Sequence, residues 1–373
     1  MRLSERIERA LALARLDGLI AASIENAIWL SGVYNPVRRM IVERPAIVLW
    51  PASGPPALIA ASVEEAFLRE RSSIPDLRLY KGTIEAAVST LFDALRNRGV
   101  ATGRLGLDVG GISAPFYLEL RRRLPDAEIV DATDLLDRLR AVKNEQEIAL
   151  LRRAALATDR AEWSTLDAFR LGWTELDVGT RLRQALIAEG AETIAHLLLG
   201  GGARGVAAHA EPQDITLQPG EVLRFDFGGV FRGWYSDIAK TAVIGSPSPR
   251  QRELYRVVHQ VLDRHIARLR PGIVVGELHK SVAHDFAQAG LEFRAPHVGH
   301  GIGLSVHEWP VLHEGSSASL EADMVLCAEI IHVEADRERY HLEEVVWVRD
   351  SGPEVVSRSR VAPAEIPTIG GSS

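Results

Sequence analysis

Hydrophobic positions recur with two different periods in the first third of the chain, and this contrast predicts a mixed α/β domain. One face of an opening helix is marked by Ile7, Leu11, Ala14 and Leu16. Apolar runs at 46–50 and 57–60 flank a segment rich in Pro, Gly and Ser, a pattern typical of a hairpin. Another short strand is expected at 105–108. We therefore predict one α/β domain over residues 1–135.

The remainder of the chain contains an internal repeat. From residue 136 to about 169 the pattern is helical and charged, which marks the entry to a second domain. Gly172–Gly190 and Gly272–Gly290 are equal segments 100 residues apart, and their apolar positions match at helical spacing. Two similar halves predict a pseudo-twofold domain over 136–356, with a site between the halves. Residues 357–373, rich in Pro, Gly and Ser, are expected to form a flexible tail.

Two predicted hairpins place carboxylates in apolar strands. A turn centred between Phe231 and Arg232 would set Asp226 opposite Asp237. Like charges directly across an antiparallel pair are unfavourable, and apolar neighbours increase the cost. Such groups must become protonated or meet cations, unless each lies on a solvated strand face.

The second half of the repeat shows the same arrangement. A turn centred on Asp336 would set Glu329 opposite Glu343, within near-continuous apolar strands. A candidate further ligand is His300, which glycines surround in the segment 299–303. One imidazole and four carboxylates suit two divalent ions of the manganese, iron, cobalt or zinc group, and suit one structural zinc poorly. Two such ions can hold a bridging hydroxide and polarise a substrate oxygen.

Composition narrows the functional class. Lys and Arg number 43 against 50 Asp and Glu, a formal net charge of −7, and no basic run occurs, so a nucleic-acid partner is not expected. The single cysteine, Cys327, excludes an intrachain disulfide and a cysteine-based zinc site. Apolar runs stay short of 18 residues, so a membrane span is not expected, and the cytoplasm is the expected compartment.

Four segments resemble a known family. The segment 299–310, Gly-His-Gly-Ile-Gly-Leu-Ser-Val-His-Glu-Trp-Pro, is similar to the signature of the pita-bread metallohydrolases, which include prolidase, aminopeptidase P, methionine aminopeptidase and creatinase. Residues 225–228 and 235–237 resemble the family's two aspartate motifs, and 142–148 resembles the start of its catalytic domain. The resemblance implies a creatinase-like N-terminal α/β domain followed by a pita-bread catalytic domain.

The resemblance also implies roles for individual side chains. Two divalent ions, Mn²⁺ or Co²⁺ first and Zn²⁺ or Fe²⁺ next, would be held by Asp226, Asp237, His300, Glu329 and Glu343. Asp237 and Glu343 would bridge the ions, and Glu329 would act as the general base. The expected catalytic histidines are His209 and His307. Substrate contacts are expected from His297, His341 and Tyr235 and, across a homodimer, from Arg38 and Arg39.

The reaction implied first is cleavage of an Xaa-Pro dipeptide or short peptide. Proline-specific members continue the first glutamate motif with Pro-Gly and carry Arg two residues before the second glutamate, where this chain has Ile330-Ile331 and His341. Lys240 stands where the family often has arginine. A neutral imidazole changes the charge and donor geometry that an arginine would provide. Two alternatives therefore stay open: a creatinase-like or ectoine hydrolase-like C–N hydrolase or a lyase, and a non-catalytic binding module.

Overall fold

The computed structural model describes residues 3–360 and 364–370. The chain folds as two compact units, residues 1–140 and 141–373. Within the described ranges, no helix combines the length and apolar character needed to cross a membrane.

The first unit is a mixed sheet covered by helices. Its strands follow the order β4-β3-β2-β1-β5-β6, in which β1–β2 and β2–β3 are antiparallel and the other pairs are parallel. The strands are β1 (Gly18–Ala21), β2 (Ile47–Pro51), β3 (Ala57–Ala61), β4 (Asp76–Tyr80), β5 (Arg104–Leu107) and β6 (Glu128–Asp131). The helices are α1 (Leu3–Ala14), α2 (Ile24–Ser31), α3 (Glu65–Arg71), α4 (Ile84–Asn97), α5 (Ala114–Arg123) and α6 (Thr133–Ala141), with short 3₁₀ turns η1 (Pro36–Arg39), η2 (Ser62–Glu64) and η3 (Val109–Gly111).

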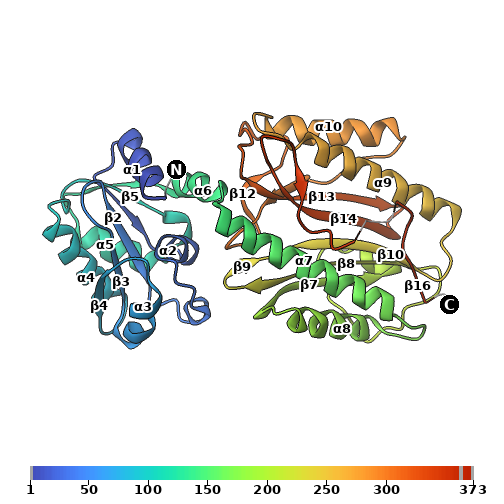
Figure 1. Cartoon of the computed structure of the whole chain (residues 1–373), viewed down its shortest axis with the longest axis horizontal. Coiled ribbons are helices and arrows are strands. Elements are labelled where there is room, and N and C mark those ends of the chain that lie inside the picture. The colour runs from blue at the N-terminus through green and yellow to red at the C-terminus, as the bar shows by residue number, and fades with distance from the viewer. Residues whose placement is uncertain (1–2, 361–363, 371–373) are drawn as a thin grey trace. The chain divides into compact units, whose positions relative to one another are not determined.

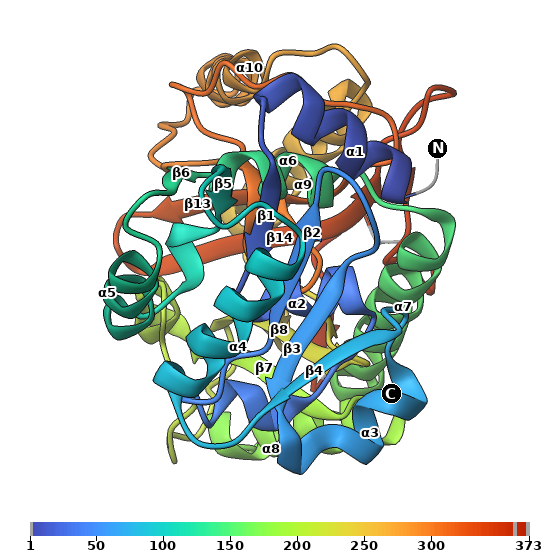
Figure 2. The ribbon, with the colours of Figure 1, turned by 90° about the vertical axis from the view of Figure 1, so that its left-hand side faces the viewer.

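The expected α/β character of this unit is confirmed. The predicted hairpin is β2–β3, whose five-residue connection contains the prolines and glycine of the turn. Helix α4 lies across the strands in Figure 2, and its apolar face packs into a core shared with α5 and the sheet. Both faces of β1, β2 and β3 are buried, which explains their continuous apolar runs.

The second unit is built on one mainly antiparallel sheet. The main path is β12-β11-β13-β14-β10-β8-β7, and β9, β15 and β16 pair at its sides. The strands are β7 (Thr193–Gly201), β8 (Val222–Phe231), β9 (Trp234–Tyr235), β10 (Ile238–Ile244), β11 (Gly299–Gly301), β12 (Glu308–Val311), β13 (Val325–Glu334), β14 (Glu338–Trp347), β15 (Glu354–Val355) and β16 (Thr368–Ile369). The helices are α7 (Glu145–Ala168), α8 (Glu175–Ala188), α9 (Pro249–Arg268) and α10 (Val275–Gln288), with the 3₁₀ segment η4 (Gly202–Val206).

The predicted repeat is confirmed in three dimensions. Helices α8 and α10 have equal length and begin 100 residues apart. Gly172, Gly190, Gly272 and Gly290 flank them with φ between 71° and 97°, a conformation that favours glycine. One core joins α7 and α8 to the β7–β8–β10 half of the sheet, and another joins α9 and α10 to the β11–β13–β14 half (Figure 1).

The two carboxylate hairpins differ in how well they could be predicted. Glu329 lies directly opposite Glu343 across β13 and β14, as expected. The other pairing was wrong by two residues, because Asp226 pairs with Ala239 and not with Asp237. The turn consists of Arg232 and Gly233, both with positive φ, a geometry that matches the twist of the flanking strands. Asp237 instead lies at the break between β9 and β10.

The segment joining the units and the C-terminal segment also depart from expectation. The helical stretch predicted from 136 is divided between α6 and α7, and Asn144 caps α7 with a capping box. Ser357 is buried, and β16 pairs in parallel with β10, so the described part of the expected flexible tail packs on the second unit. Residues 361–363 and 371–373 of that tail lie outside the described residues.

Candidate metal centre

All five expected ligands converge on one face of the sheet in the second unit. Asp226 comes from β8, Glu329 from β13, Glu343 from β14 and His300 from β11, while Asp237 follows β9. Ligand atoms of Asp237, His300 and Glu343 lie within 4.8 Å of one another, and a second such group joins Asp226 to Glu343. The sequence-predicted acidic cluster is therefore a single constellation.

The negative charge of these buried carboxylates is unfavourable unless cations compensate it. Burial raises the pKa of Asp237 to about 7, where the nearby Asp226 charge adds to the rise and His196 opposes it. Burial, followed by the charges of Asp237 and Glu329, also raises the pKa of Glu343 well above its usual range. Three buried oxygens of this cluster accept no hydrogen bond from the described residues: Asp237 Oδ1, Glu329 Oε2 and Glu343 Oε1. Buried acceptors without donors are costly, so divalent ions fit this donor set.

His300 is oriented as a metal ligand. Its Nδ1 donates a hydrogen bond to Gly301 O at 3.0 Å, so the proton is on Nδ1 and Nε2 keeps its lone pair. Nε2 lies 3.6 Å from Glu343 Oε1 and 3.7 Å from Asp237 Oδ2. Burial lowers the pKa of His300 to about 4, which keeps the imidazole neutral and able to coordinate.

Further imidazoles surround Glu329. His341 Nε2 lies 2.9 Å from Glu329 Oε1, and His297 Nδ1 lies 3.1 Å from Glu329 Oε2. Burial alone would raise the pKa of Glu329, but these two histidines outweigh it and hold that pKa well below the usual range. The ring of His307 stacks on that of His300 at 3.6 Å between centroids, which places His307 at the edge of the carboxylate cluster.

The centre opens into a cavity of about 930 Å³. His209, His297, His307 and His341 all line it, together with Asp226, Asp237 and Glu329. Tyr235 is half-buried and donates its backbone N–H to Gly303 O; it is not among the described residues that line the cavity. The structure therefore brings the expected catalytic and ligand residues of this unit together.

Arg38 and Arg39 belong to the first unit. Arg38 is buried 3.5 Å from Glu64, and Arg39 forms a 2.9 Å ion pair with Glu25. Their expected contact with a substrate stays a prediction.

Sequence reasoning missed three side chains near the centre. His196 of β7 lies beside Asp226 and Asp237. Arg339 lines the cavity from β14. It lies four residues before Glu343, and side chains an even number of residues apart on a strand point to the same face of the sheet, so the sequence could have indicated its position. Cys327 lies among Asp237, His300 and Glu343, but burial raises the pKa of its thiol well above the usual range, so it remains a neutral thiol.

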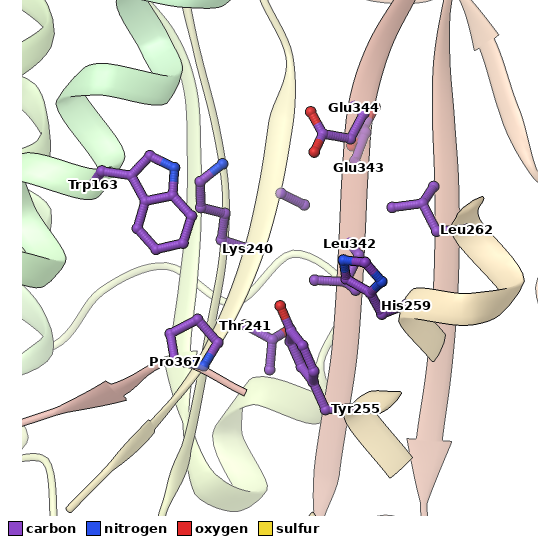
Figure 3. Close-up of a pocket in the computed structure, with 11 residues that line it drawn as sticks. Trp163, Lys240, Thr241, Tyr255, His259, Leu262, Leu342, Glu343, Glu344 and Pro367 are labelled. Atoms are coloured by element: carbon purple, nitrogen blue, oxygen red, sulfur yellow. The ribbon is translucent and has the colours of Figure 1, made fainter. Parts of the chain in front are cut away.

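A buried ionic network stabilises β10 next to the centre. Lys240 Nζ lies 2.6 Å from Asp159 Oδ1 and 3.0 Å from Glu162 Oε2, both on α7. Figure 3 shows Lys240 beside the ring of Trp163, near Glu344 of the neighbouring strand. The cavity between these side chains is only about 30 Å³, which suits a water molecule and not a substrate. Lys240 is therefore a structural cation.

The two-unit fold and the cluster of carboxylates and imidazoles together define a class of metal-dependent hydrolases. Comparison with known proteins places the chain in the same class. Residues 149–350 match Metallopeptidase family M24, and residues 4–142 match the Creatinase/Prolidase N-terminal domain. The chain belongs to family M24.

Similarity extends over nearly the whole chain. It is 29% identical over 350 residues to the probable dipeptidase PepE of Mycobacterium tuberculosis, covering 92% of this chain and 90% of the relative. It is 33% identical over 246 residues to the Xaa-Pro dipeptidase of Lactobacillus helveticus, covering 64% of this chain and 66% of the relative. The crystal structure of dipeptidase PepE from Mycobacterium ulcerans superposes with a TM-score of 0.84 at 27% identity, covering 100% of this chain and 98% of that one. The N-terminal creatinase-like domain and the pita-bread domain with its curled sheet are thus established.

Proposed function

We propose that this M24 metallopeptidase is a dipeptidase of the Xaa-Pro type that uses two divalent metal ions. The observation that carries the proposal is the convergence of Asp226, Asp237, His300, Glu329 and Glu343, with three of their buried oxygens lacking hydrogen-bond donors. Mn²⁺ or Co²⁺ is the proposed metal, because the donors are carboxylate oxygens and imidazole. When bound, the ions supply an activated water and polarise the amide carbonyl of the substrate.

The side chains of the second unit provide the proton transfers. Glu329 accepts a proton from the nucleophilic water and returns it to the leaving amine, a role that its position at the cavity wall permits. His297 and His341 hold the carboxylate of Glu329 in place from either oxygen. His307, stacked on His300, donates a hydrogen bond to the carbonyl oxygen as negative charge develops there. His209, which lines the same cavity, is a second donor to substrate.

The cavity also offers a recognition group for the carboxylate of a dipeptide. Arg339 donates through Nη1 to Val206 O at 3.4 Å, and its buried Nε has no hydrogen-bond partner in the described structure. A guanidinium binds carboxylates well, since its donors match the two oxygens. We propose that Arg339 binds the C-terminal carboxylate of the substrate and thereby favours dipeptides over longer peptides.

The second candidate function rests on one departure from the family pattern. His341 contacts Glu329 where proline-specific members carry arginine, and Pro-Gly is absent after Glu329. This change of charge favours a different small amide or amidino substrate, as in the creatinase-like and ectoine hydrolase-like reactions.

A panel assay separates the candidates. Protein loaded with Mn²⁺ or Co²⁺ is incubated with Xaa-Pro dipeptides, other dipeptides, longer Xaa-Pro peptides, creatine and ectoine. We expect cleavage of dipeptides, with Xaa-Pro dipeptides preferred. Absence of cleavage of every peptide, with turnover of creatine or ectoine, would establish the second candidate.

The proposal also includes a cytoplasmic location and a homodimer. In this homodimer Arg38 and Arg39 reach the substrate bound to the partner subunit. Size-exclusion chromatography with light scattering tests the dimer.

A further inference from the structure

His196 lies at the metal centre although it is outside the expected ligand set. It projects from β7, and its Nε2 is 2.9 Å from Asp226 Oδ1 and 3.0 Å from Asp237 Oδ1. These three residues form a compact group whose ligand atoms lie within 4.8 Å of one another. The imidazole of His196 therefore lies closer to its two carboxylates than that of His300, whose Nε2 is 3.7 Å from Asp237 and 3.6 Å from Glu343.

A hydrogen bond cannot account for both contacts. A neutral imidazole carries one proton on one nitrogen, so Nε2 can donate to a single acceptor. Only the contact with Asp226 has hydrogen-bond geometry; Asp237 Oδ1 is buried and accepts no hydrogen bond from any described residue. The close contact between His196 Nε2 and Asp237 Oδ1 is thus left without a hydrogen bond.

The spacing of these atoms fits a shared cation. Metal–nitrogen and metal–oxygen bonds of about 2.0–2.2 Å set neighbouring ligand atoms at right angles about 3 Å apart. The separations of 2.9 Å and 3.0 Å around His196 Nε2 agree with this value. A cation bound by all three atoms would also satisfy Asp237 Oδ1.

The backbone holds the imidazole in this position. The pairing of β7 with β8 shifts register between Ile194 and His196, and His196 then faces Gly228. A Cβ at Gly228 would lie 2.8 Å from His196 Cε1 and 1.9 Å from Ser236 O, so only glycine leaves room for the ring there. The bulge and the glycine together direct the ring toward the aspartates.

We propose that His196 Nε2 is an additional ligand of the metal ion held by Asp226 and Asp237, which gives each ion an imidazole of its own. The proposal rests on the metal centre of the proposed function. His300 serves the other ion, close to Glu343. A nitrogen donor in place of an oxygen donor favours cobalt, zinc or iron over magnesium at that position.

Metal titration and crystallography test this assignment. Chelator-stripped wild type, His196→Gln and His196→Phe are titrated with Co²⁺ by calorimetry, with His284→Gln as a matched control because His284 is exposed on α10. We expect two Co²⁺ per chain in wild type and control, and affinity for one of the two reduced by at least about 10-fold in both His196 variants. A Co²⁺-loaded wild-type crystal should show His196 Nε2 about 2.0–2.2 Å from one ion.

The structure of the Co²⁺-loaded wild type tests the assignment even if the variants do not fold. A separation of more than 3 Å between His196 Nε2 and both ions, or two unaltered Co²⁺ affinities in His196→Gln, would overturn the assignment. If the peptide panel is still cleaved in that case, the proposed function stands without His196 as a ligand. If His196 ligates cobalt and the panel is blank, the assignment stands and the proposed peptidase activity fails. A wild-type protein that binds no Co²⁺ overturns both.

Discussion

Lys143 Nζ and Glu308 Oε2 form a 2.7 Å ion pair in which both side chains are almost fully buried. Lys143 precedes α7, and Glu308 directly follows His307. The other oxygen of Glu308 accepts the backbone N–H of Leu304 at 2.8 Å. The pair therefore connects the start of the catalytic domain to the loop between His300 and His307, and it orients that loop.

Loss of this ion pair is expected to destabilise the protein. Lys143→Met leaves Glu308 charged and buried, a change that costs about 3–5 kcal/mol of unfolding free energy. Turnover is also expected to fall, because His307 loses its fixed position. Denaturant unfolding and dipeptide hydrolysis measure the two effects. Lys280→Met removes an exposed pair with Glu277 and should change stability by no more than about 1 kcal/mol. Equal stability losses in the two variants would contradict this explanation.

Removal of either of the two carboxylates proposed to bridge the ions is expected to abolish metal uptake. Asp237→Ala and Glu343→Ala each remove a buried oxygen donor from the cluster, so bound Mn²⁺ and dipeptide turnover should both be lost. Metal content after dialysis and initial rates provide the measurements. The exposed Glu277→Ala variant serves as the control and should retain both metal and activity. Full activity in metal-stripped Asp237→Ala would falsify the dinuclear assignment.

His307 should affect turnover without affecting metal content. The stacked ring lies beside His300 but belongs to none of the groups of described residues that could hold an ion. We expect His307→Ala to lower kcat by about 100-fold, the scale of a lost transition-state hydrogen bond, with metal stoichiometry unchanged. Unchanged kcat would remove His307 from the mechanism, and loss of metal would assign it a different role.

Arg339 should determine affinity for the substrate carboxylate. Arg339→Met is expected to raise KM for dipeptides by about 10–100-fold, which corresponds to loss of one charge-assisted hydrogen bond, with a smaller change in kcat. Dipeptide amides, which lack the carboxylate, should show no such change. Arg294 lines the same cavity but is exposed and paired with Glu292, so Arg294→Met is the matched control. An equal rise in KM for acids and amides would refute carboxylate recognition.

The buried side chain of His265 is expected to make the free energy of unfolding depend on pH. Burial lowers its pKa from 6.5 to about 4, while Nε2 donates to Val298 O at 2.8 Å. Because the unfolded state binds this proton more readily, the stabilisation is fully present above pH 6.5 and is lost as pH falls toward 4, by about 3 kcal/mol. Denaturant unfolding of metal-free protein between pH 7 and 4 should show a shallower slope in His265→Gln than in wild type. The exposed His284→Gln variant should keep the wild-type slope, and identical slopes in all three proteins would contradict the prediction.

Local patterns predicted much of the catalytic unit. The pairing of Glu329 with Glu343 could be derived because both strands are long, apolar and joined by a short turn, so that counting from Asp336 gives the register. The pairing of Asp226 could not, since a turn of Arg232 and Gly233 with positive φ moves the centre of the hairpin by one residue and the partner of Asp226 by two. Hairpin register depends on turn conformation, which hydrophobic periodicity does not specify.

The sequence by itself determined the two-domain α/β organisation and the repeated halves, and it predicted the five expected ligands, because periodicity and motif spacing are properties of short segments. Only the tertiary structure decided that His196 joins Asp226 and Asp237, that Lys143 pairs with Glu308, and that residues 368–369 form a strand beside β10. Each of these contacts joins segments whose relative positions depend on strand register and on packing around a shared core, and neither is encoded in any one segment.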